Sequence, residues 1–172
     1  MKPLESDEKI VTVMVYTHSM LARGELVAKE SVRTSILLRT QGVPNYLHLH
    51  KPKIVLFGGS PPTNLTPAEV FIPTPSVIAF HIAAPTPPDE MDYDPTEAHR
   101  MMQPVDLIVG TFLLKGHLRL SSQAELGASL EVMRTSWLSI YDVNFANPYL
   151  PQFRLHVPML VINPTQVSIG LA

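Results

Sequence analysis

The segments MLARGEL (residues 20–26) and FLLKGHL (residues 112–118) decide the fold, because they are two copies of one pattern at an offset of 92. Two further pairs extend the match. YLHLH (46–50) aligns with WLSIY (137–141) at an offset of 91, and FIPTPSVI (71–78) aligns with LVINPTQV (160–167) at an offset of 89. Because the three offsets differ by so little, we interpret the chain as a tandem duplication.

Each copy has the pattern of a short-stranded β domain. Apolar, β-branched runs of about five residues alternate with turn residues, which predicts strands separated by tight connections. Gly24 and Gly116 are predicted to lie at hairpin turns, because glycine tolerates a positive φ. Pro75 and Pro164 interrupt the last apolar runs of each copy, and proline cannot donate to a sheet ladder, so turns are predicted there too. Between the second and third strands both copies favour a short helical turn, with a strand as the alternative in the first copy.

This order of elements resembles the Sm-like and SH3-like small β-barrels, and also a group of uncharacterised bacterial domains. The bacterial group shares the Lys/Arg-Gly-x-Leu segment with both copies, and its Tyr/Phe-Leu-x-Leu strand matches residues 46–49, where the second copy has Trp-Leu-Ser-Ile (137–140). The resemblance implies an all-β protein of two tandem small barrels. The predicted organisation is a disordered N-terminus (1–9), a first repeat (10–83), a linker (84–104) and a second repeat (105–172).

The linker is rich in proline and acid. Five carboxylates lie between positions 89 and 97, a third of the fifteen in the chain: Asp89, Glu90, Asp92, Asp94 and Glu97. Such a segment is predicted to be a solvated, semi-extended tether. The alternative is an acidic peptide that docks on a basic partner.

The composition argues against several classes of function. The chain has 172 residues, 45% hydrophobic and 16% charged, with a formal net charge of −2, so it lacks the basic excess that phosphate binding requires. It has no cysteine, which excludes disulfides and thiolate sites. No apolar run of about 18 residues and no apolar leader segment is present, so we expect a soluble cytoplasmic protein without a membrane span.

His48 and His50 are the candidate metal ligands. Alternation along a strand places both imidazoles on one face, about 7 Å apart along the chain. A metal would need a third ligand, for instance His81 or His18. The second copy has Ser139 and Tyr141 at these positions, so a metal would belong to one copy only. The alternative is a surface or interfacial histidine pair.

The sequence predicts no catalytic residue and no cofactor. No nucleophile elbow or phosphate-binding loop is present. An Sm-like RNA pocket would need Arg-Gly in the last strands, where this chain has residues 73–75 and 163–165 instead, which argues against nucleic-acid binding. We therefore expect a non-catalytic binding or scaffold module that forms a homo-oligomer through strand edges, with an unidentified protein partner. The alternatives are an Sm-like nucleic-acid or nucleotide binder and a metal-dependent enzyme that uses His48 and His50.

Overall fold

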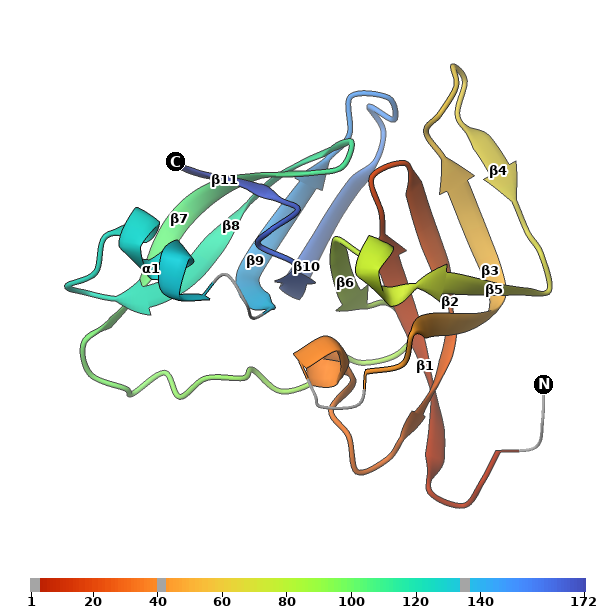
Figure 1. The fold of residues 1–172 in the computed structure, drawn as a ribbon, viewed down its shortest axis with the longest axis horizontal. Coiled ribbons are helices and arrows are strands. Elements are labelled where there is room, and N and C mark those ends of the chain that lie inside the picture. The colour runs from red at the N-terminus through yellow and green to blue at the C-terminus, as the bar shows by residue number, and fades with distance from the viewer. Residues whose placement is uncertain (1–3, 40–42, 134–136) are drawn as a thin grey trace. The chain divides into compact units, whose positions relative to one another are not determined.

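The computed structural model describes residues 4–39, 43–133 and 137–172, and divides the chain into two compact units. Unit 1 is Met1–Asp89 and unit 2 is Glu90–Ala172. Both units consist predominantly of strands, and every strand pairing within them is antiparallel (Figure 1). The all-β prediction is therefore confirmed. No helix in the described residues is long and apolar enough to cross a membrane.

Unit 1 is built on the hairpin of its first two strands, with β6 beside β1 and β3 beside β2. Strands β4 and β5 both pair with β3, at its second half and its first half respectively. The elements are β1 (Glu8–Tyr16), β2 (Met20–Lys29), η1 (Thr34–Arg39), β3 (Tyr46–Leu56), β4 (Thr63–Leu65), β5 (Glu69–Pro73), η2 (Thr74–Ser76) and β6 (Ala79–Ile82). The predicted helical turn after β2 is therefore confirmed, and the alternative of a strand there is wrong.

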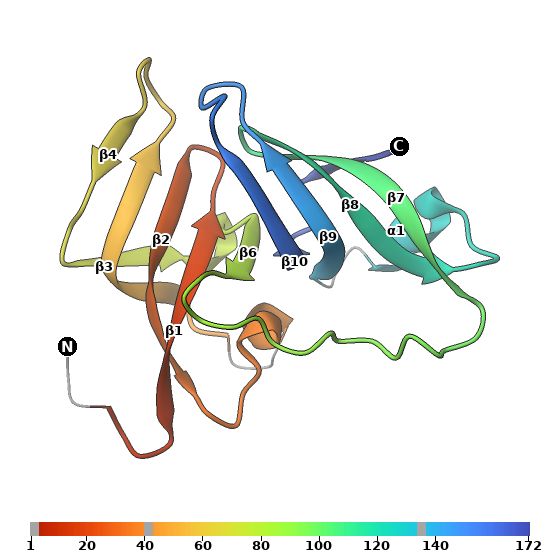
Figure 2. The same ribbon diagram turned by 180° about the vertical axis from the view of Figure 1, so that it is seen from behind.

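Unit 2 repeats these pairings with one strand fewer. Its first two strands form a hairpin, β9 pairs with β8, β10 pairs with β9, and β11 pairs with β7 (Figure 2). The elements are β7 (Arg100–Val109), β8 (Phe112–Ser121), α1 (Leu126–Met133), β9 (Leu138–Ala146), β10 (Arg154–Ile162) and β11 (Ser168–Leu171). In both units the described pairings leave the sheet open, so closed barrels are not observed.

The two glycines of the repeated segment do not form hairpin turns, and this prediction is wrong. Gly24 lies inside β2 and Gly116 lies inside β8, each where the register with the next strand shifts. A Cβ at Gly24 would lie 2.9 Å from the Leu49 Cβ, and one at Gly116 would lie 2.7 Å from the Ile140 Cγ2. These positions need glycine because the neighbouring strand approaches too closely for a side chain.

The chain reverses elsewhere. In unit 1 the turn is closed by the Thr17 amide, which donates to the Met20 carbonyl at 2.9 Å. In unit 2 it contains Gly110, whose φ is 58°. Pro75 lies in η2, and Pro164 lies in the turn between β10 and β11, where Asn163 Oδ1 accepts from the Thr165 amide at 3.1 Å.

A residue with positive φ follows the close approach in both units. Lys51 (φ 47°) and Asp142 (φ 53°) are 91 positions apart, at the bulges of β3 and β9. One extra residue in a bulged strand bends the sheet. The bend turns the apolar faces inward, and the largest buried side chains include Leu47, Leu49 and Phe80 in unit 1. In unit 2 the largest buried side chains include Leu114, Ile140 and Leu160.

The predicted disordered N-terminus (1–9) and the predicted linker (84–104) each contain the start of a strand. Strand β1 begins at Glu8, inside the predicted disordered range 1–9, and Lys29 Nζ lies 2.8 Å from Glu5 and 3.0 Å from Asp7. Residues 1–3 lie outside the described part of the chain. Strand β7 begins at Arg100, inside the predicted linker 84–104.

Candidate functional site

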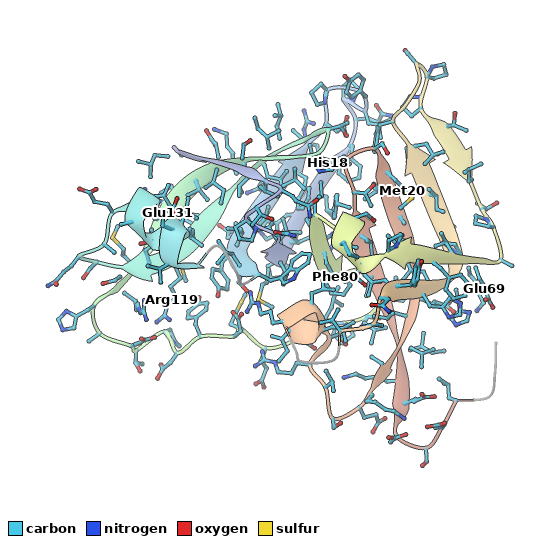
Figure 3. All side chains as sticks on the ribbon, viewed as in Figure 1. His18, Met20, Glu69, Phe80, Arg119 and Glu131 are labelled. Atoms are coloured by element: carbon cyan, nitrogen blue, oxygen red, sulfur yellow. The ribbon has the colours of Figure 1, made fainter. Side chains whose placement is uncertain are left out.

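The candidate site is a cluster of two histidines and one glutamate at the pairing of β3 with β5 in unit 1. In that register Glu69 lies opposite His50, and Phe71 lies opposite His48. His48 and His50 point to the same side of β3 because side chains alternate along a strand. Glu69 is the first residue of β5, so it approaches the pair from the neighbouring strand (Figure 3).

The three side chains are already in contact. His48 Nε2 lies 2.9 Å from Glu69 Oε2, and His50 Nδ1 lies 3.3 Å from Glu69 Oε1. The two imidazole rings are 4.2 Å apart between centroids, and the His48 ring stacks on Phe71 at 4.1 Å. The hydrogen bond from His48, assisted by the charges of both histidines, holds the pKa of Glu69 below its ordinary value.

This cluster is the only group of three potential ligand residues that the described residues bring together, with all ligand atoms within 4.8 Å of one another. Neither histidine predicted as a third ligand belongs to it. His18 lies exposed in the turn between β1 and β2 (Figure 3), and His81 lies buried in β6. The prediction of His18 or His81 as the third ligand is therefore wrong, and Glu69 occupies that place.

His81 belongs to the core of unit 1. Its Nδ1 donates to the Ile82 carbonyl at 2.8 Å, and its Nε2 lies 3.1 Å from the Tyr16 hydroxyl. Burial lowers the pKa of His81 to about 4, because the cationic form would lose its hydration. The same burial raises the pKa of Tyr16 well above its ordinary value. Both groups are therefore neutral at pH 7.

Sequence reasoning missed Glu69, although one signal pointed to it. Glu69 is the only acidic residue between Glu30 and Asp89. A single carboxylate in an otherwise acid-free stretch is a candidate partner for the only paired histidines there. The pairing of β3 with β5, which the sequence did not predict, brings them together.

The corresponding positions of unit 2 hold a different cluster. Ser139 Oγ donates to Asp92 Oδ2 at 2.7 Å, and the Tyr141 hydroxyl donates to Asp92 Oδ1 at 2.6 Å. These two residues lie on β9 where His48 and His50 lie on β3. One carboxylate again joins the pair, but it comes from the segment before β7 rather than from the next strand.

The acidic segment is largely exposed to solvent, as predicted, but several of its side chains contact the units. Asp89 accepts a hydrogen bond from the Ser35 amide at 2.8 Å in unit 1. In unit 2 Arg119 donates to Glu97 at 2.7 Å and lies over the Tyr93 ring at 4.8 Å. Internal partners thus occupy several of its acids, which weakens the hypothesis of an acidic peptide that docks on a basic partner.

An apolar groove lies on unit 2 beside its last strand. Its volume is about 790 Å³, and β7, β8, β9 and β11 contribute to it. Ile108 and Leu113 are exposed in this groove, next to Ile169 of β11. Lys115 and Arg154 also border it. A groove of this size is large enough for a bulky side chain or a small ligand.

No protein-family model, no curated protein and no solved structure matches this chain.

Proposed function

We propose that the chain is a non-catalytic scaffold of two duplicated small-barrel-like units that associates with further copies of itself head to tail. In this assembly β5 of one molecule pairs with β11 of the next. The observation that carries the proposal is that these two strands are exposed edges of different kinds. β5 pairs with β3, the third strand of its unit, whereas β11 pairs with β7, the first strand of its unit.

Exposure separates these strands from β6 and β10, and length separates them from β4, which is exposed but has only three residues. Three of the four residues of β6 are buried, and β10 ends in buried residues. By contrast, Phe71 on β5 is 58% exposed and Leu171 on β11 is 64% exposed. Strand β11 has no charged residue and no proline, the features that usually protect a sheet edge from pairing.

The groove on unit 2 supplies a second reason. It lies beside β11, and its exposed apolar residues would be covered by side chains of an added strand. Phe71 projects from β5 as a large apolar side chain, the type of residue that anchors interfaces when it fills a pocket. Because the two surfaces are different, the contact is heterologous, and it produces a ring if the rotation closes and a filament if it does not.

The first experiment measures mass. Light scattering on the eluted full chain should give a mass that rises above the 19.1 kDa of one chain as concentration increases. Phe71→Lys and Leu171→Lys should each reduce the assembly to monomers, because a charge on either edge opposes strand pairing. Val132→Lys is the matched control, since Val132 is 83% exposed and lies on α1, which belongs to neither strand.

Mixing the two variants tests the head-to-tail geometry. The Phe71→Lys chain keeps an intact β11, and the Leu171→Lys chain keeps an intact β5, so together they should form one contact and elute as a 1:1 dimer. A symmetric contact between like edges would instead leave one variant self-associated alone. A wild-type chain that stays monomeric at millimolar concentration would reject the proposal.

A further inference from the structure

Beyond self-association, we propose that His48, His50 and Glu69 bind one divalent transition cation of the zinc class. The cluster offers two imidazole nitrogens and a carboxylate, and this donor set with one open position is a known zinc arrangement. Mg²⁺ and Ca²⁺ prefer sites made of oxygen ligands alone, so they fit the cluster less well.

The distances are close to those that a metal needs. In a tetrahedral zinc site with bonds of about 2.0–2.2 Å, neighbouring ligand atoms lie about 3.4 Å apart. Glu69 already lies 2.9 Å from His48 Nε2 and 3.3 Å from His50 Nδ1, and no ligand atom is more than 4.8 Å from another. Small side-chain rotations are therefore enough to place a cation among them.

The strand pairing also preorganises the ligands. Glu69 is fixed opposite His50 by the register of β3 with β5, and Phe71 holds the His48 ring by stacking at 4.1 Å. The backbone amide of Lys51 donates to the Ala68 carbonyl at 2.8 Å, which fixes the start of β5 beside the bulge. Less conformational freedom is then lost when the cation binds.

The site is also open to an incoming cation. The Glu69 side chain is 40% exposed and the His48 side chain is half-buried. Imidazole and carboxylate ligate a metal only in their deprotonated forms, so zinc binding weakens as the pH falls. Unit 2 does not offer this chemistry at the same place, because Ser139 and Tyr141 present hydroxyl groups to Asp92.

Isothermal titration of chelator-treated full-length protein with Zn²⁺ tests the site. We expect one Zn²⁺ per chain, with affinity reduced about tenfold or more in His48→Gln, His50→Gln and Glu69→Gln. The matched control is His156→Gln. His156 Nε2 lies 2.6 Å from Asp142 in unit 2, a histidine–carboxylate pair outside the cluster, and its loss should leave the titration unchanged.

Thermal unfolding gives a readout that does not depend on heats of binding. Zn²⁺ should raise the midpoint of the wild-type chain, whereas Ca²⁺ at equal concentration should not. Glu69→Gln should abolish the zinc shift without lowering the midpoint of the metal-free chain, since Glu69 is exposed. Three outcomes reject the site. The first is no heat of binding with Zn²⁺ up to about 100 μM, a dissociation constant that corresponds to a binding free energy of roughly −5.5 kcal/mol. The others are binding of Zn²⁺ by the three variants equal to that of the wild type, and equal stabilisation by Ca²⁺.

Discussion

In unit 1 a carboxylate joins two imidazoles of the third strand, whereas in unit 2 a carboxylate joins two hydroxyl groups at the corresponding positions. Glu69 contacts His48 and His50, and Asp92 accepts from Ser139 and Tyr141. The cluster in unit 2 is held by hydrogen bonds from two hydroxyl groups to one carboxylate. Its counterpart in unit 1 differs in two respects that matter for function: its donors can ligate a metal, and its carboxylate is accessible.

The backbone around these clusters is shared by the two units. Each unit has a glycine where the second and third strands approach closely. In each, the residue that follows the second member of the pair has a positive φ, namely Lys51 after His50 and Asp142 after Tyr141. The neighbouring ion pair is reversed. Lys51 lies 3.0 Å from Glu25 in unit 1, whereas Asp142 lies 3.9 Å from His117 in unit 2. The bend therefore does not depend on the sign of the charge at this position. The two units have a similar backbone here but different side chains.

The largest expected difference between the units is their response to acid. The pKa of His81 is lowered from 6.5 to about 4 in the folded chain, so the unfolded chain binds a proton first as the pH falls. Stability from neutral His81 is complete above about pH 6.5 and is lost progressively down to about pH 4. The difference corresponds to about 3 kcal/mol. Unit 2 has Gly170 in the equivalent strand, so this loss is specific to unit 1.

Urea unfolding at pH 7 and at pH 5 measures this effect. Far-UV circular dichroism follows the whole chain, and the single tryptophan, Trp137, reports on unit 2. The midpoint by circular dichroism should fall with pH, and His81→Gln should remove most of that dependence, while His18→Gln should not. Identical pH dependence in the wild type and in His81→Gln would contradict the assignment.

The next effect tests whether the two glycines have the same role. Gly24→Ala and Gly116→Ala should each destabilise the chain by about 1–3 kcal/mol, because the added methyl overlaps Leu49 or Ile140. Gly58→Ala is the control, since a Cβ there meets nothing within 4 Å. Urea midpoints measure all three. If only one of the two core variants is destabilised, the bends of the two units are not equivalent.

The sequence predicted the strands better than their connections. Strand segments such as 10–16 and 46–50 were evident because β-branched alternation is a local signal. Gly24 and Gly116 were assigned to turns because a glycine in a strand and one in a turn look alike until the neighbouring strand is placed. His48 and His50 share a local spacing, but Glu69 joins them only through the pairing of β3 with β5, a contact between residues about 20 positions apart.

The smallest expected effect is the loss of folding stability when either carboxylate, Asp92 or Glu69, is removed. Asp92→Ala removes two partly buried hydrogen bonds to hydroxyl groups, which should cost about 1–2 kcal/mol. Glu69→Ala should change the metal-free midpoint little, because an exposed ion pair exchanges protein contacts for water. A double-mutant cycle of Asp92→Ala with Tyr141→Phe isolates the bond in unit 2. A larger loss from Glu69→Ala than from Asp92→Ala would mean that the cluster in unit 1 is the structural one, and the functional difference between the units would have to lie elsewhere.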